Sequence, residues 1–310
     1  MQQEYLEKLQ KKTLETLKFA IDFFEHHNLH YFACGGTCLG AVRHHGMIPC
    51  DDDVDLFMPY EDYVRFINLK PEIEHEGKYK LYTIDTPTQL DPFCRLVDTN
   101  TIIWRHYLNP QILGSQIDIF PLYETNIEDY HQLFDLLKKN FKLTWRYQRA
   151  NQKYSFVNFK ESIQHKDLRG VLKNLKWAWS TRYVKQYKKE LEEFQSTLNE
   201  PNGKRFVNFS SIIYNLEVFE KEWFAEYIEM PFNNLKIRVP IEYDKYLKMI
   251  YHDYMQLPPK EKRQPTHQCY YMNLSEGLTI DEVRKRPHGD KQTSRDGGTP
   301  WSRELHRYAD

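Results

Sequence analysis

The sequence is poor in cysteine and in long hydrophobic runs, and each shortage argues against a class of protein. Its 310 residues include five cysteines and no CxxC spacing, which argues against a disulfide scaffold or a Cys-rich zinc site and favours the reducing cytoplasm. No run of about 18 apolar residues occurs, so we expect no membrane-spanning helix. The polar N-terminus is unlike a secretory signal. A net charge of −1 argues against nucleic acid as a partner.

Composition divides the chain into four parts. Residues 1–125 mix helical and strand periodicity, which predicts an α/β core with one mixed sheet. Residues 126–205 read as a basic, aromatic-rich helical region, and residues 206–283 as a mixed part that packs on the core. The last part, 284–310, has few apolar residues, so we expect a flexible tail whose deletion leaves activity unchanged.

Local patterns predict individual elements. Helices are expected over 4–28, 39–45, 61–69, 129–143, 219–228 (FEKEWFAEYI) and 243–254. Strands are expected over 29–34, 53–58, 79–84, 93–97, 102–104, 117–123 and 235–239.

Glycine is scarce but concentrated. Of 12 glycines, four lie between positions 35 and 46, where the backbone must need open geometry. Gly35, Gly36 and Thr37 stand between an expected strand and a short helix. A helix N-terminus favours an anion, and glycines allow close approach, so these three residues are candidates to seat a phosphate.

Four of the five residues from 51 to 55 are aspartates. On a strand, Asp53 and Asp55 share one face, while Val54, Leu56 and Met58 point into the core. Neighbouring carboxylates repel each other unless cations compensate, and oxygen ligands at close quarters suit Mg²⁺ or Mn²⁺. A solvated acidic turn is the simpler alternative, but the apolar alternation and the upstream glycines favour a metal site.

A second strand carries the same pattern. Asp118 alternates with Ile117 and Ile119, and an unpaired acid is costly in a buried sheet. If this strand neighbours residues 53–58, Asp118 joins Asp53 and Asp55 as a third ligand. The alternative is an exposed residue on an edge strand.

The stretch 34–59, CGGTCLGAVRHHGMIPCDDDVDLFMP, resembles the motif of the LicD family, and further similarity runs through 117–121, 237–246 and 257–267. These proteins are phosphocholine and polyol-phosphate transferases of microbial surface polysaccharides, related to fukutin and fukutin-related protein. One departure is Cys50, where the family often carries Trp.

The resemblance implies a nucleotidyltransferase-like fold and a divalent-metal mechanism. By motif position, Asp53, Asp55 and Asp118 would be the catalytic residues and the ligands of Mg²⁺ or Mn²⁺, with Asp51 supporting metal or substrate. The implied reaction moves phosphocholine from CDP-choline to a sugar hydroxyl of a glycan or glycolipid acceptor, releasing CMP. Transfer of glycerol phosphate or ribitol phosphate from a CDP-polyol is one alternative. A non-catalytic, membrane-associated glycan-binding protein is another.

Five basic residues are further candidates for substrate binding. Arg43 and His44 follow the glycine loop, Arg95 alternates with apolar residues on a strand, and Arg263 and His267 lie in the similar segment 257–267. Each could neutralise phosphate charge. A helix C-terminus explains the first two equally well, and an ion pair with an acid explains Arg95.

Residues 138–189 hold fifteen Lys or Arg against two acidic residues, with Trp177 and Trp179 among them. Such a composition suits peripheral contact with an anionic membrane. The alternative is a solvated helical subdomain that buries its aromatics.

Overall fold

The protein is described by a computed structural model, over residues 3–87, 89, 91–104, 112–151, 156–164, 166–210, 216–259, 263, 271–279 and 282. It is a mixed α/β structure, as the sequence predicts. The expected tail, 284–310, lies outside the described residues.

The helices and strands lie at the following positions. The α-helices are α1 (Gln3–His26), α2 (Gly35–His44), α3 (Tyr60–Asn68), α4 (Lys70–Ile73), α5 (Tyr130–Asn151), α6 (Phe156–Gln164), α7 (Leu168–Ser180), α8 (Val184–Gln195) and α9 (Tyr243–Tyr251). Two 3₁₀ turns are η1 (Thr181–Tyr183) and η2 (Lys221–Phe224). The strands are β1 (Phe32–Ala33), β2 (Asp55–Pro59), β3 (Tyr79–Tyr82), β4 (Cys94–Asp98), β5 (Ile102–Trp104), β6 (Ile112–Leu113), β7 (Gln116–Thr125), β8 (Arg205–Asn208), β9 (Glu217–Glu220), β10 (Tyr227–Phe232), β11 (Leu235–Pro240) and β12 (Tyr271–Asn273).

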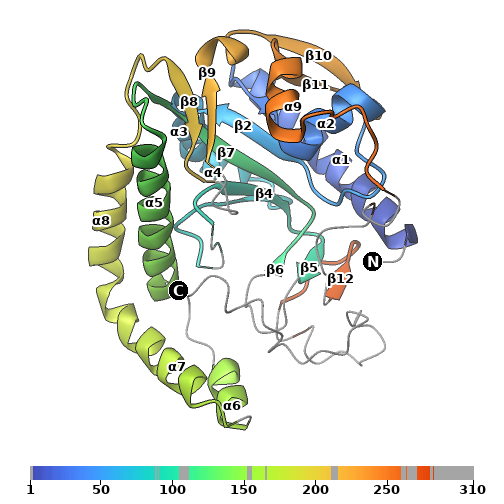
Figure 1. The fold of residues 1–310 in the computed structure, drawn as a ribbon. Helices are drawn as coiled ribbons and strands as arrows, with labels where there is room; N and C mark the ends of the chain where they lie inside the picture. Colours follow the sequence, from blue (N-terminus) through green and yellow to red (C-terminus); the bar gives the residue numbers. More distant parts are fainter. Residues whose placement is uncertain are drawn as a thin grey trace.

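The main sheet runs in the order β1-β2-β7-β4-β3, with β8 paired to β7 and β9 to β8 (Figure 1). β2 lies parallel to β7, and the other pairs are antiparallel. The expectation of one sheet within residues 1–125 is therefore wrong. The chain after residue 204 adds β8 and β9 to the main sheet, and β5 and β6 join β12 in a separate sheet.

Both faces of the central strands are covered. Leu56 and Met58 of β2 are fully buried on one side, and helices α1 and α3 contact β7. Phe57, which alternates with Leu56 and Met58, is 2% exposed and packs against Phe219 and Tyr246. A parallel strand pair is usually buried on both faces, and β2–β7 follows that rule.

Two expected helices differ from the structure. Residues 219–228 do not form a helix: they end β9, form η2 and begin β10. Phe219 is drawn into the β8–β9 ladder opposite Phe206, because burial in the aromatic core outweighs local helical spacing. Helix α2 begins at Gly35 rather than Leu39, so the glycines belong to its first turn.

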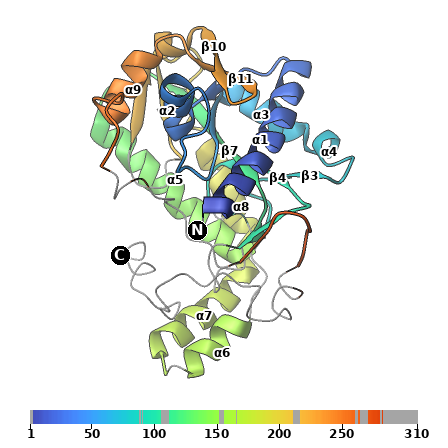
Figure 2. The same ribbon diagram turned by 90° about the vertical axis from the view of Figure 1, so that its right-hand side faces the viewer.

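The region between the two sheet-forming parts is helical. α5 and α8 pack side by side, and α6 and α7 continue beyond them at the end of the molecule away from β2 and β7 (Figures 1 and 2). Among the described residues, no helix is both long enough and apolar enough to cross a bilayer.

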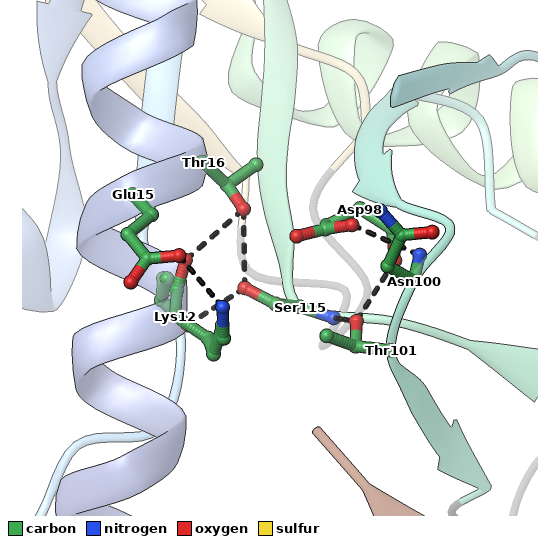
Figure 3. A network of polar contacts seen from close by, with 8 residues as sticks. Lys12, Glu15, Thr16, Asp98, Asn100, Thr101 and Ser115 are labelled. Atoms are coloured by element: carbon green, nitrogen blue, oxygen red, sulfur yellow. Dashed lines mark hydrogen bonds and ion pairs between the residues drawn. The ribbon is translucent and has the colours of Figure 1, made fainter. Parts of the chain in front are cut away.

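A buried polar network fixes α1 to the start of β7 (Figure 3). The Thr16 and Ser115 hydroxyls lie 3.2 Å apart, and the Ser115 backbone N–H donates to Thr101 Oγ1 at 2.7 Å. The Thr101 hydroxyl in turn donates to the Asp98 carbonyl at 2.8 Å. All of these oxygens are hidden from water, so each hydrogen bond replaces lost solvation.

We expect Thr101→Val to lower the free energy of unfolding by about 1–3 kcal/mol, because it leaves the buried Ser115 N–H without its acceptor. Thr101→Ser keeps the hydroxyl and should lose less than half as much. Urea unfolding of the two variants beside the parent chain measures both. A valine variant as stable as the serine variant would show that this hydrogen bond does not stabilise the fold.

Candidate functional site

Strand register lines up two carboxylates and a guanidinium. Asp118 on β7 is the register partner of Asp55 on β2 and of Arg95 on β4. Side chains directly opposite each other on paired strands share a face. The expectation that the strand of Asp118 neighbours that of Asp55 is confirmed, and an edge-strand position is excluded because Asp118 is 7% exposed between two strands.

Arg95 holds Asp118 in one orientation. Its Nε donates to Asp118 Oδ1 at 3.0 Å, and its Nη1 contacts Asp91 Oδ2 at 2.7 Å and Gln89 Oε1 at 2.8 Å. Burial by itself would lower the pKa of Arg95, but the carboxylates of Asp118 and Asp91 reverse that and raise it. Arg95 is therefore permanently charged. Of the two interpretations left open for Arg95, the ion pair with an acid is observed.

Three consecutive aspartates form a cluster ahead of β2. One carboxylate oxygen from each of Asp51, Asp52 and Asp53 lies within 4.8 Å of the others. Burial, and next the charge of Asp53, raise the pKa of Asp51 to about 8. Burial also raises the pKa of Asp55 well above its usual value, with Asp53 and Asp118 adding to the effect. The site therefore gathers acidic groups in a place with little water, where each is costly to ionise.

The first turn of α2 is tied to the start of β2. The Cys34 N–H donates to the Asp55 carbonyl at 3.1 Å, and the Asp55 N–H donates to Thr37 Oγ1 at 2.8 Å. Thr37, expected to seat phosphate, thus has a described role in positioning Asp55. Gly35 has a φ of +50°, which disfavours any side chain, and its N–H donates to the Tyr246 hydroxyl at 2.7 Å.

Gly36 allows a carboxylate to approach the helix. A Cβ on Gly36 would lie 2.6 Å from Asp51 Oδ2. Since backbone N–H groups in the first turn have no partner within the helix, this end attracts anions. Gly35, Gly36, Asp51 and Asp55 are consequently brought together, as the motif implies.

The other described candidates have hydrogen-bond partners outside this group. Arg43 and His44 occupy the last turn of α2, where Arg43 Nη1 donates to the Tyr254 carbonyl at 2.6 Å. Burial and the charge of Arg43 lower the pKa of His44. Arg263 is exposed and donates to the Pro258 carbonyl. His267 lies outside the described residues.

The sequence analysis missed several neighbours of the carboxylates. Gln116 Nε2 donates to Asp118 Oδ1 at 2.7 Å, and its position two residues earlier on the same strand face was a usable signal. Asp52 was visible within the aspartate run. A Cβ placed on Gly35 would lie 3.8 Å from the Tyr251 hydroxyl and 3.7 Å from Asp55 Oδ2, so Tyr251 is about as close to Gly35 as Asp55 is. Nothing in the local sequence indicates Tyr251.

These residues fit a divalent cation. The donor set consists of carboxylate oxygens, which Mg²⁺ and Mn²⁺ prefer. Asp51 and Asp55 are destabilised as anions by burial and by neighbouring aspartates, so a bound cation would relieve a cost that is already present. Asp53 contributes charge to both and belongs to the same group.

Comparison with known proteins agrees with this geometry. The family model described as "LicD/FKTN/FKRP, nucleotidyltransferase domain" matches residues 28–163, which include α2, β2, β4 and β7. Residues 28–163 are therefore similar to the LicD family. The resemblance noted in the sequence is thereby confirmed. In this LicD-type domain lie all the carboxylates of the site, whereas Tyr246 and Tyr251 come from the chain that follows it.

Three curated relatives are similar to the chain. The lipopolysaccharide cholinephosphotransferase LicD of Haemophilus influenzae is 24% identical over 263 residues, covering 80% of this chain and 91% of that protein. Uncharacterized proteins of Rickettsia prowazekii and Rickettsia typhi are 34% and 36% identical over 105 and 91 residues, which cover 40% and 29% of their lengths.

The raised pKa of Asp51 predicts a pH dependence of stability in buffer containing EDTA. The folded state keeps the proton up to about pH 8, whereas the unfolded chain releases it near 3.8. The free energy of unfolding should therefore fall as the pH rises from about 4 to 8. Urea titrations across that range measure the slope. It should be shallower in Asp51→Asn and unchanged in the exposed control Asp135→Asn; equal slopes in all three proteins would contradict the assignment.

Proposed function

We propose that this chain is a metal-dependent phosphotransferase that moves phosphocholine from CDP-choline to a sugar hydroxyl of a cell-surface glycan or its lipid-linked precursor. The observation that carries the proposal is the pairing of Asp55 with Asp118 beside the N-terminus of α2. The name of the Haemophilus influenzae relative, which the alignment covers almost entirely, supports choline phosphate as the cargo and lipopolysaccharide as the kind of acceptor.

In the proposed reaction the acceptor oxygen attacks the phosphorus that carries choline. The new phosphodiester bond forms as the bond to the CMP oxygen breaks, and the hydroxyl proton passes to a carboxylate of the site. Mg²⁺ or Mn²⁺, held by Asp53, Asp55 and Asp118, would supply neutralisation of diphosphate charge. Arg95 and Gln116 fix the orientation of Asp118, and the first turn of α2 presents N–H groups to phosphate.

The residues around the carboxylates contribute by holding them in fixed positions. Each ligand of a diphosphate site must keep its place while charge moves, and carboxylates held by buried donors do so better than mobile ones. Asp118 receives two donors on one oxygen, and Asp55 is anchored through both its N–H and its carbonyl.

We place this chemistry at the cytoplasmic side of the membrane.

The donor is the first quantity to test. With Mn²⁺ and a bacterial lipopolysaccharide acceptor, we expect CMP release from CDP-choline to exceed that from CDP-glycerol and CDP-ribitol by at least about tenfold. Faster release from either CDP-polyol would replace phosphocholine by that polyol phosphate. No metal-dependent release from any donor would favour the non-catalytic binding protein.

Asp55→Asn tests the carboxylates. We expect turnover to fall by at least about a hundredfold, because a charged ligand becomes a neutral amide of the same shape. The melting temperature should stay level or rise, since the substitution removes repulsion between Asp55 and Asp118. Asp135→Asn is the matched control, because Asp135 is an exposed acid on α5 whose side chain is 72% accessible.

Measuring CMP release and melting temperature on the same samples separates chemistry from folding. An Asp55→Asn protein that turns over at the parent rate would defeat the assignment. The same pair of measurements on Asp53→Ala extends the test to the aspartate cluster.

A further inference from the structure

Helix α7 exposes an apolar stripe. The stripe consists of side chains at steps of four, three and four residues, with exposed fractions of 77%, 67%, 52% and 53%: Leu168, Leu172, Leu175 and Trp179. At 3.6 residues per turn, this spacing places all four on one face of the helix. We call them the α7 stripe. Large apolar side chains grouped this way on a surface mark an interaction site.

The opposite face of α7 is already used. Asn174 and Trp177 are each 8% exposed, and the Asn174 side-chain amide donates to the Gly170 carbonyl at 2.8 Å. α7 contacts α5 and α6, and the Asn174 amide also reaches the Ser162 hydroxyl of α6 at 3.4 Å. Trp177 was expected at a membrane surface together with Trp179; its burial makes that expectation wrong for Trp177 and leaves Trp179 as the exposed indole.

Cations border the α7 stripe. Arg169, Lys173 and Lys176 are exposed and follow one edge of it, and the sequence of α7 contains no Asp or Glu. Lys166 and Arg182, exposed just beyond the two ends of the helix, carry the same sign. An apolar face flanked by cations, with Trp at one end, matches the charge and polarity of an anionic lipid surface.

We propose that the α7 stripe docks this protein on an anionic lipid bilayer. The leucines and Trp179 would enter the boundary between headgroups and acyl chains, while Arg169, Lys173 and Lys176 meet the lipid phosphates. A second copy of the chain fits less well, because pairing two α7 stripes would bring cationic edges together without acidic partners on the helix.

The position of α7 agrees with docking. Both views of the molecule place α6 and α7 at the end away from β2 and β7, so a bilayer at this end does not cover the carboxylates (Figures 1 and 2). The inference rests on exposure and charge and is independent of the proposed chemistry, so either can fail without the other.

Co-sedimentation of the full chain with vesicles tests the proposal. We expect binding to vesicles of phosphatidylcholine mixed with phosphatidylglycerol, and at least tenfold weaker binding to vesicles of phosphatidylcholine alone. Leu172→Asp should weaken binding to the anionic vesicles by at least tenfold, since it places a charge in the centre of the α7 stripe. Loss of one cation should weaken binding to the anionic vesicles by roughly fivefold. The double variant Lys173→Glu with Lys176→Glu should lose more than this for each residue, because each substitution also adds an acid.

Tyr130→Asp is the matched control. Tyr130 is 52% exposed at the start of α5, so this variant makes the same exchange of an apolar side chain for an acid outside α7. It should bind like the parent chain. Equal binding of parent and Leu172→Asp, or no binding by the parent, would overturn the proposal.

Two further measurements distinguish the other outcomes. Sedimentation equilibrium reports self-association: a parent dimer that Leu172→Asp converts to a monomer, with vesicle binding unchanged, would make the α7 stripe a contact between copies and overturn lipid docking. CMP release with a soluble sugar acceptor should be equal in parent and Leu172→Asp, so loss of docking is read separately from loss of chemistry.

Discussion

The arrangement of the site depends on the repulsion between two carboxylates that the main sheet forces side by side. Asp55 and Asp118 are register partners on parallel strands. Among the described residues in the same row across the sheet, Arg95 on the next strand supplies the compensating positive charge. A slip of one residue would turn Asp118 to the opposite face and bury it among the leucines and isoleucines. The register therefore has to be fixed by apolar packing, which Leu56, Ile117 and Ile119 provide at complete burial. Core packing thus maintains an electrostatic cost that a bound divalent cation would relieve.

The helix N-terminus opposite these strands is held by residues far apart in the chain. Thr37 and Cys34 tie α2 to β2 locally, whereas the hydroxyl of Tyr246 reaches Gly35 across 211 positions of sequence. Tyr246 is itself packed among Phe57, Phe219 and Phe224. The LicD-type domain supplies the carboxylates, and the later part of the chain supplies a wall behind the glycines. The geometry of the candidate site at α2 consequently depends on the packing of a segment that carries no part of the aspartate motif.

Sequence alone identified the elements whose patterns are local. The aspartate run, the Gly-Gly pair and the alternation around Asp118 each indicate a local element. Pairing of β2 with β7 was the condition under which Asp118 joins the other aspartates, and the structure confirms it. Arg95 could be placed on the correct face, but its ion pairs with Asp118 and Asp91 depend on strand order, which no local pattern encodes. For residues 219–228 a local pattern was present but misleading. Their apolar spacing predicted a helix, whereas Phe219 packs in the aromatic core as part of a strand. Tyr251 was invisible for the same reason as Tyr246, because its contact is long-range.

The acidic candidate site and the cations of α7 lie at two ends of the molecule, and this separation limits what those cations can neutralise. In the proposed reaction the carboxylates of the site cannot neutralise the diphosphate of the donor, so binding of the donor would be coupled to binding of a cation. The cations of α7 cannot perform that neutralisation, because salt screens charges over about 8 Å and Figure 1 places α7 beyond the far end of α5 from the sheet. The role proposed for this basic surface is therefore contact with a different negatively charged partner. A near-zero net charge conceals this separation, which the sequence shows as an aspartate run at 51–55 and a basic stretch at 138–189.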